Sequence, residues 1–221
     1  MEKIDLRAVF EKSGRAVFIS HLDLFRTMQR ALKRSKLPVW YSQGFNPHIY
    51  LNFPLALSLG VSSRTEFMDL SVTEMTDLDE AMDRLNAVMP EGIKILGIAE
   101  PVFQNKDIGF ADYEMRFIGR EAPRRILEGV EKMLAMDVIE IDKRSKSKGT
   151  VKMDIRPHIN ILCTEISGEA LKVSLRLPAG GTLNINSNVF ADVLSDISGV
   201  TFESVYAERT KILCKNGEKF V

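Results

Sequence analysis

Hydrophobic and polar positions near the start of the chain predict a strand followed by an amphipathic helix. Residues 5–12 alternate as a half-buried strand does. Ser20 and Asp23 then resemble the capping box that begins a helix, and this helix should run to about Lys36, before Pro38. One side of its helical wheel is apolar, and the other carries a basic ridge made of Arg26, Arg30, Lys33 and Arg34. We therefore predict a helix that buries one stripe and exposes four cations.

The rest of the first half completes a βαββαβ order. The expected elements are a turn-rich loop at 40–47, strands at 48–57 and 64–73 joined around Gly60, a helix from Asp77 to Met89, and a strand at 93–98. This order is that of a ferredoxin-like module.

The second half repeats the order with little sequence similarity. Its expected elements are strands at 113–118, 138–142 or 156–164, 171–177 and 202–213, a helix beginning near Pro123, and a helix capped by Asn186 or Ser187. The sequence therefore predicts an α+β protein of two tandem ferredoxin-like modules with antiparallel sheets. The first module covers 1–104, and the second covers 105–221 and includes a basic loop at 143–152. A length of 221 residues suits two such cores.

Composition narrows the class of protein. Hydrophobic residues make up 45% and charged residues 27%, as in globular proteins, which excludes disordered and coiled-coil classes. No apolar run approaches the length that crosses a bilayer, and the first residues do not resemble a secretory signal. The two cysteines, Cys163 and Cys214, do not form a disulfide framework. We expect a cytoplasmic protein with reduced thiols and no membrane contact.

Charge is unevenly distributed, although the net charge is zero. Residues 1–60 hold nine Lys or Arg against four Asp or Glu, residues 61–140 hold nine against seventeen, and residues 141–221 hold twelve against nine. The densest basic run contains Lys143, Arg144, Lys146, Lys148 and Lys152. Together with the basic ridge it predicts two cationic surfaces, one in each module, of the kind that holds phosphates. Solvated faces without a ligand are the alternative interpretation.

Three histidines are the candidate chemical groups. His21 falls in the first helical turn, where it either contacts an anion or packs as a helix-end imidazole. His48 follows Pro47 and is either a general acid or base, a base-stacking contact, or an exposed strand residue. Neither these residues nor His158 lie at metal-ligand spacing, so no metal or cofactor is expected.

Four motifs resemble the radical-SAM-linked protein family of unknown function. They are Ile19-Ser-His21-Leu-Asp23-Leu, Tyr41-Ser-Gln-Gly44-Phe-Asn-Pro47, Leu57-Ser-Leu-Gly60-Val-Ser-Ser and Asp154-Ile-Arg156-Pro157. The resemblance covers nearly the whole chain and implies a radical SAM protein as partner, with a role in RNA or ribosome biology. His48 stands where the family commonly has a basic residue, and Asn184-Ile-Asn-Ser stands where an Arg-Pro pair is usual.

The first half is also distantly similar, at the level of fold, to tandem ferredoxin-like endoribonucleases that process CRISPR repeats. Those enzymes cleave RNA without a metal by means of a histidine with a tyrosine or lysine. That resemblance implies His21 or His48, with Tyr41, as candidate catalytic residues. The radical SAM chemistry itself needs three clustered cysteines, which this chain lacks.

The main hypothesis is an accessory RNA-binding protein that works with a radical SAM enzyme in tRNA or rRNA modification or ribosome-related RNA processing. The RNA contacts would come from the basic ridge, Lys143, Arg144, Lys146, Lys148 and Arg156, and a more specific pocket would come from His21, Tyr41, Asn46 and His48. Two alternatives stay open. One is a metal-independent endoribonuclease, and the other is a structural subunit of the radical SAM protein with no nucleic-acid contact.

Overall fold

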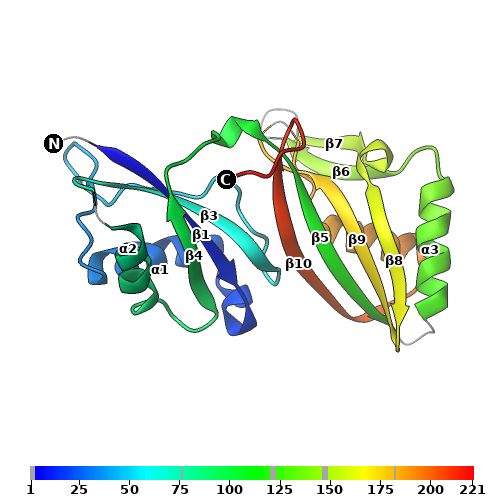
Figure 1. Ribbon diagram of the computed structural model, residues 1–221. Coiled ribbons are helices and arrows are strands. Elements are labelled where there is room, and N and C mark those ends of the chain that lie inside the picture. Colours follow the sequence, from blue (N-terminus) through cyan, green and yellow to red (C-terminus); the bar gives the residue numbers. More distant parts are fainter. Residues whose placement is uncertain (1–2, 76, 120–122, 146–148, 182) are drawn as a thin grey trace. The chain divides into compact units, whose positions relative to one another are not determined.

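A computed structural model describes residues 3–75, 77–119, 123–145, 149–181 and 183–221 (Figure 1). Side chains of residues 143–145 are not among those described. The described part contains four α-helices, α1 (His21–Arg34), α2 (Leu78–Asn86), α3 (Pro123–Ala135) and α4 (Ser187–Ser198). Three short 3-10 helices are η1 (Gly14–Phe18), η2 (Asn105–Asp107) and η3 (Arg156–His158).

Ten strands lie in the same described part of the chain. They are β1 (Ile4–Lys12), β2 (Leu51–Asn52), β3 (Ser62–Val72), β4 (Ile93–Ala99), β5 (Ile108–Gly119), β6 (Glu140–Ser145), β7 (Gly149–Asp154), β8 (Asn160–Ser167), β9 (Ala170–Pro178) and β10 (Phe202–Cys214). Eight of them belong to a large, mostly antiparallel sheet, and β6 and β7 form a separate hairpin. The protein is therefore a mixed α/β fold.

The chain divides into two compact units. The first unit contains residues 1–109 and 208–221, and the second contains residues 110–207. The predicted boundary after residue 104 assigned residues 208–221 to the second module, whereas these residues belong to the first unit. The C-terminal segment returns to the first unit because the end of β10 pairs in parallel with β3, with Glu208 opposite Ser62 and Arg209 opposite Ser63.

The first unit has the strand order β4-β1-β3-β2, and each neighbouring pair is antiparallel. The predicted strand at 48–57 is wrong in extent, because only Leu51–Asn52 pairs with β3. Pro54, which follows closely, carries no backbone N–H to donate to a ladder, and the chain continues as a loop. The other four predicted elements at 5–12, 64–73, 77–89 and 93–98 are confirmed with small shifts of their ends.

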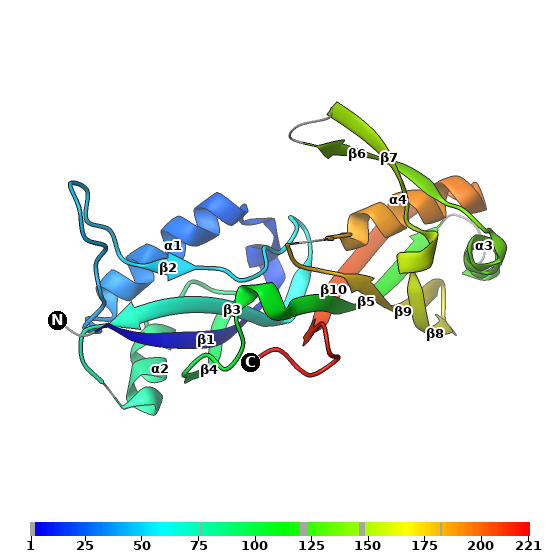
Figure 2. The same cartoon turned by 90° about the horizontal axis from the view of Figure 1, so that it is seen from above.

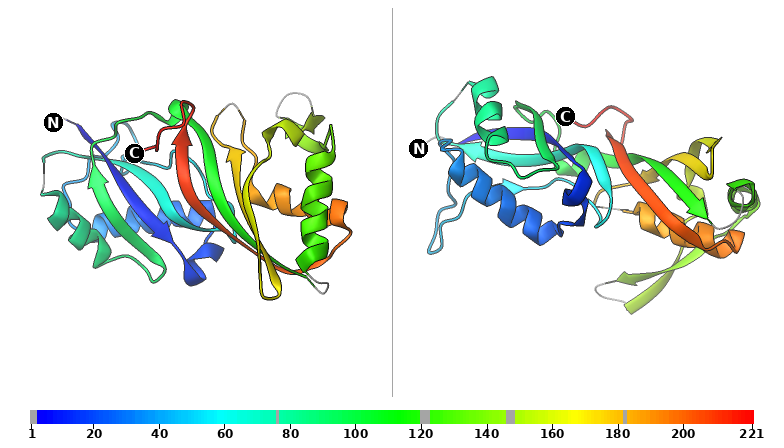
Figure 3. Two further views of the ribbon diagram at one scale, coloured as in Figure 1. Left: turned by 45° about the vertical axis from the view of Figure 1, so that its right-hand side comes forward. Right: turned by 90° about the horizontal axis from the view of Figure 1, so that it is seen from below.

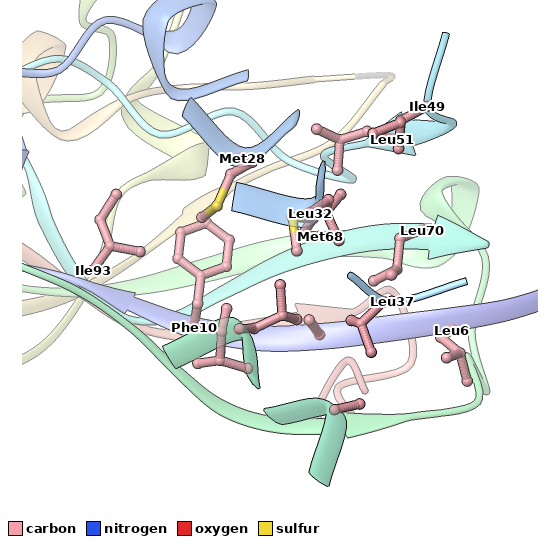
Figure 4. Packing of buried hydrophobic residues seen from close by; sticks show 14 of the residues in the cluster. Leu6, Phe10, Met28, Leu32, Leu37, Ile49, Leu51, Met68, Leu70 and Ile93 are labelled. Carbon is pink, nitrogen blue, oxygen red and sulfur yellow. The ribbon is translucent and has the colours of Figure 1, made fainter. Parts of the chain in front are cut away.

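One hydrophobic cluster holds the first unit together (Figure 4). Ser20 is the N-cap of helix α1, and its hydroxyl accepts the Asp23 N–H at 3.1 Å. The apolar stripe of α1 then places Met28 and Leu32 against Phe10 of β1, and all three are fully buried. Burial of each such side chain stabilises the fold by about 1.5–3 kcal/mol. The predicted apolar stripe of this helix is confirmed.

The second unit contains β5, β9 and β8 as an antiparallel run, with α3 packed against α4. In Figure 3, α4 crosses behind these strands and α3 lies near β8. The two helices approach closely at Gly129, where an added Cβ would lie 2.4 Å from the Ser198 side chain. Phe117, Phe190 and Phe202 pack their rings together in this core, which contains the predicted helices and the strands at 113–118, 171–177 and 202–213.

The second unit also contains the hairpin β6–β7, which the βαββαβ order does not require. The sequence left open whether 138–142 or 156–164 supplies the strand beside 171–177. The structure gives both segments strands: β6 pairs with β7, whereas β8 pairs with β9. The described element order is therefore longer than that of a ferredoxin-like module, and the tandem arrangement stays a prediction. No helix among the described residues is both long and apolar enough to cross a membrane.

Candidate nucleic-acid interface

The basic ridge of α1 is exposed, as its wheel predicts. All four of its cationic residues are classed as exposed. Arg26 is 3.4 Å from the Asp23 carboxylate in a solvent-exposed pair, and Arg34 donates to the Val88 carbonyl at 2.9 Å. Among the described residues, Arg30 and Lys33 form no ion pair. The ridge therefore keeps positive charge available for an anionic ligand.

A loop between α1 and β2 presents aromatic and polar groups, and we call residues 41–48 the aromatic loop. Its base is closed by backbone hydrogen bonds, from Ser42 N–H to the His48 carbonyl at 2.8 Å and from Tyr50 N–H to the Trp40 carbonyl at 3.2 Å. Phe45, near its tip, is fully exposed. Its ring is therefore accessible for stacking on a partner molecule.

His48 helps to close the aromatic loop through one ring nitrogen. Its Nδ1 lies 2.9 Å from Ser42 Oγ and 3.2 Å from the Asn46 carbonyl, while the same Ser42 Oγ accepts the His48 backbone N–H. Because the carbonyl can only accept, the tautomer with hydrogen on Nδ1 satisfies this arrangement best. Nε2 then carries a lone pair and has no partner among the described residues. Nε2 is the atom that would accept a proton or contact a nucleobase.

The aromatic loop and α1 lie on the same side of β1 and β3, in the first unit (Figures 2 and 3). Figure 2 shows the loop near the C-terminal end of the helix, the end that carries Lys33 and Arg34. The structure thus brings the end of α1 that carries Lys33 and Arg34 close to the aromatic loop. Tyr41 is 41% exposed and Asn46 is also exposed, so both stay available in this region.

His21 occupies a different place. It is the first residue of α1, so about 20 Å of helix separates it from Arg34. Its exposed ring meets Phe53 edge-on, with centroids 5.4 Å apart. Of the two interpretations of His21, this contact agrees with an imidazole that packs at the end of a helix. The aromatic loop therefore supplies the predicted pocket residues Tyr41, Asn46 and His48 without His21.

The described part of the predicted basic loop lies on the paired strands β6 and β7, where Lys143 is opposite Val151 and Ser145 is opposite Gly149. The side chains of Lys143 and Arg144, and the whole of Lys146 and Lys148, lie outside the described residues. Lys152 is described, and its ammonium group lies 2.8 Å from the Glu140 carboxylate. Figure 2 shows the hairpin extending away from the helices and strands of the second unit. The second predicted cationic surface, on this hairpin, stays a prediction.

Arg156 and Asp154 fasten the hairpin to α3. The Arg156 guanidinium donates to the carbonyls of Leu134 and Met136 at 2.6 and 3.0 Å, where the helix leaves its last carbonyls without partners. The Asp154 carboxylate accepts the backbone N–H groups of Ile139 and Arg156, and these bonds hold its pKa below the usual range. We call this arrangement the clasp. Arg156, which the sequence analysis predicted to contact RNA, thus has a structural role at the end of α3. Its contact with RNA stays a prediction.

The first unit contains buried charged residues that were not predicted from the sequence. Glu66 and Arg209 are each about 3% exposed and lie 3.1 Å apart, and Lys12 donates to the Ile19 carbonyl at 3.0 Å. Burial raises the pKa of Glu66 against the pull of Arg209, and burial lowers the pKa of Lys12. The sequence held one signal of this burial, because Lys12 follows Ala8 and Phe10 at alternate positions of β1, on the side that faces the core. Among the described residues, no cluster of histidine, cysteine and acidic side chains has the makings of a metal site.

Comparisons with known proteins identify a family. The model of a family described as uncharacterized protein conserved in bacteria (DUF2344) matches residues 5–187, so the chain belongs to that family. No curated protein matches the chain. A solved structure entitled Crystal Structure of a Cbf5-Nop10-Gar1 Complex is similar over 93% of this chain, with 13% identity and a TM-score of 0.44. This chain spans 48% of that one, about half its length.

Proposed function

We propose that this member of the DUF2344 family is an accessory RNA-binding protein that works with a radical SAM enzyme in tRNA or rRNA modification or ribosome-related RNA processing. The observation that carries the RNA-binding part is that α1, with its exposed basic ridge, and the aromatic loop, with its fully exposed Phe45, lie on the same side of β1 and β3 in the first unit (Figure 2). Arg30 and Lys33 are exposed there without acidic partners among the described residues.

The two features suit the two parts of a nucleotide. Exposed cations neutralise phosphates and release counterions, which gives affinity without sequence preference. An exposed aromatic ring stacks on an unpaired base, which is worth about 1–3 kcal/mol per base. A single-stranded or looped RNA offers both groups at once, whereas a duplex keeps its bases stacked inside. We therefore expect the aromatic loop to contact unpaired nucleotides.

The radical SAM partner is supported by the four motifs that resemble the radical-SAM-linked family. The chain has two cysteines, one exposed and one buried, and so lacks the three that hold the cluster of a radical SAM enzyme. The catalyst would accordingly be the partner. The tandem ferredoxin-like origin of the fold is likewise our proposal, supported by the order β4-β1-β3-β2 of the first unit.

RNA binding is tested by the salt dependence of affinity. We expect the purified protein to bind labelled tRNA and a single-stranded oligonucleotide, with log K falling steeply against log salt. The double variant Arg30→Gln, Lys33→Gln should lower the magnitude of that slope by about 1.4 for the single strand, because each lost phosphate contact removes about 0.7. A matched control changes two exposed cations on β4 and β10, Lys94→Gln with Lys211→Gln, and should leave the slope unchanged.

Two results would count against the proposal. Equal loss of slope in both double variants would indicate diffuse attraction instead of a site on α1. Absence of RNA binding, together with co-purification of a radical SAM protein, would instead favour the structural subunit. Absence of any radical SAM protein from a tagged preparation made in the native host would remove the partner from the proposal.

An endoribonuclease is the second candidate, because Nε2 of His48 carries no partner among the described residues. A base at that atom could take the proton of a ribose 2′-hydroxyl, and no metal is needed for that step. Cleavage of labelled RNA in the presence of a chelator, abolished in His48→Ala and retained in His21→Ala, would establish this activity. Intact RNA after long incubation with the wild-type protein would exclude it for that substrate.

A further inference from the structure

A pocket of about 390 Å³ lies in the first unit, on the face of β1 and β3 opposite the hydrophobic cluster. Strand register creates its floor. Asp69 of β3 is opposite Asn52 of β2 on one side and opposite Arg7 of β1 on the other. Their neighbours Leu51, Leu70 and Leu6 belong to the hydrophobic cluster, so alternation turns the three polar side chains to the other face.

The charges on this floor are paired. Arg7 donates to both oxygens of Asp69, at 2.6 and 3.1 Å, and also to the carbonyls of Phe103 and Val221. Asp5 accepts the Ser71 hydroxyl at 2.6 Å and lies 2.9 Å from the Lys3 ammonium. Two carboxylates and two cations thus balance. A ligand for this pocket is therefore a neutral group that forms hydrogen bonds, and a phosphate finds no excess positive charge here.

The walls of the pocket combine apolar and amide groups. Pro101, Val102 and Phe103 form one wall, and Val102 is 71% exposed. Asn105 and Asn52 supply amides, and Tyr50 supplies a ring and a hydroxyl. The Asn52 amide has no hydrogen-bond partner among the described residues. Such a mixture of flat apolar surface and a few polar groups is typical of a small-molecule site.

We infer that this pocket binds a guanine base, either as a free nucleotide or as an unpaired residue of RNA. Carboxylate oxygens only accept hydrogen bonds, so the best base presents adjacent donors. Guanine does so with N1–H and the 2-amino group. Adenine and cytosine place an acceptor beside their amino group, and uracil has one donor between two acceptors. Asn52 can donate to the guanine O6 or N7 acceptor.

Asp5 is the carboxylate best placed to receive these donors. Its side chain is 54% exposed, and Lys3 and Ser71 both contact one of its oxygens, Oδ1. The two lone pairs of the second oxygen can accept from both adjacent guanine donors. Burial alone would raise the pKa of Asp5, but hydrogen bonds from Lys3 and Ser71 outweigh it and leave the pKa below its usual value. The group is therefore ionised at neutral pH and acts as an acceptor. Asp69 is held mainly by Arg7 and forms the floor.

The inference is tested by titrating the 221-residue protein with guanosine monophosphate and with adenosine monophosphate, with binding measured by calorimetry and by NMR. We expect guanosine monophosphate to bind at least tenfold more tightly than adenosine monophosphate. Asp5→Asn should weaken the guanosine nucleotide by about tenfold, because the amide replaces one acceptor with a donor. The control Asp79→Asn, on the exposed side of α2, should leave both affinities unchanged.

Equal affinity for the two nucleotides, tighter binding of adenosine monophosphate, or no binding at millimolar concentration would each overturn the inference. An effect of Asp79→Asn as large as that of Asp5→Asn would do the same. The NMR spectrum of each variant establishes that it is folded. Because free nucleotides are used, this test can fail while the salt-dependent binding of RNA by α1 stands, and the reverse also holds.

Discussion

At the scale of single residues, the first unit places a carboxylate between two cations in its interior. Both carboxylate oxygens of Glu66 accept from one Arg209 nitrogen, at 3.1 and 3.2 Å, and a second Arg209 nitrogen donates to the Ala56 carbonyl. Lys12 uses its ammonium group on carbonyls of the segment that precedes α1. These bonds fix the position of the loop before His21 and of the loop after β2. The buried charges therefore set the geometry of the two nearest segments that the sequence analysis singled out, at 19–24 and 57–63.

Removal of Glu66 should be strongly destabilising. Glu66→Ala leaves the guanidinium of Arg209 buried without its anion, so the free energy of unfolding should fall by about 3–5 kcal/mol. Urea denaturation measures this change. Glu165→Ala, which breaks an exposed pair with Lys172, serves as the control and should change stability by less than about 1 kcal/mol. Similar effects of the two substitutions would contradict the interpretation.

Phe45 should matter for RNA and not for folding. Phe45→Ala removes a side chain without buried contacts, so the free energy of unfolding should change by less than about 0.5 kcal/mol. Loss of one stacked base should weaken binding of a single-stranded oligonucleotide by about tenfold. Fluorescence anisotropy measures the affinity. Phe18→Ala, another exposed phenylalanine, should have no comparable effect on RNA binding, and equal effects would argue against the aromatic loop.

At the scale of secondary-structure elements, the clasp decides how the hairpin β6–β7 is attached. Ile155 is fully buried and its N–H donates to the Ile139 carbonyl, while Asp154 binds the Ile139 N–H. The Asp-Ile-Arg-Pro motif thus acts through backbone contacts of the hairpin and through the carbonyls of α3. The Asp-Ile-Arg-Pro motif, which the sequence analysis linked to function, therefore also stabilises the attachment of the hairpin to α3.

The clasp should be sensitive to acid. Because the pKa of Asp154 in the folded protein lies below its ordinary value, ionised Asp154 contributes stability above about pH 4, and the contribution is lost as pH falls through the folded value. Asp154→Asn, which mimics the protonated carboxyl, should be less stable than the wild type at pH 7 and equally stable at low pH. Urea unfolding between pH 7 and pH 2 tests this. A difference that is independent of pH would contradict it.

At the scale of the whole molecule, the first unit is built from two distant parts of the sequence. Residues 208–221 supply Arg209 to Glu66 and Phe220 to the ring of Phe67, with centroids 5.1 Å apart. The second unit is inserted between these parts. Cooperativity of the first unit therefore depends on a segment that the sequence assigned to the other module.

A fragment of residues 1–109 should consequently fold poorly. It lacks the partner of Glu66 and the ring that packs on Phe67, so it should show broad, poorly dispersed NMR signals. Addition of a peptide spanning residues 202–221 should restore dispersion in part. A well-dispersed spectrum for the fragment alone would mean that the C-terminal segment is dispensable for this unit.

The sequence predicted most of the elements because each depends on local chemistry. The Ser20 and Asn186 caps, the apolar stripe of α1 and the exposed ridge follow from side-chain spacing alone. The predicted strand at 48–57 was too long, because the apolar residues in this range do not indicate which backbone groups pair with a neighbouring strand. For the candidate site, the sequence named Tyr41, Asn46 and His48, but grouped them with His21, which the length of α1 separates from its basic C-terminal end.

By itself, the sequence determined the helices, most strands, the basic ridge and the turn-rich loop at 40–47, since periodicity, caps and turn residues act over a few positions. Tertiary structure alone decided the pairing of β10 with β3, the burial of Glu66 with Arg209, and the row of Asn52, Asp69 and Arg7 that floors the pocket. Those contacts join residues separated by as many as 146 positions. Hydrogen-bond register and burial between such distant segments leave no periodic trace in the chain, so only the folded protein shows them.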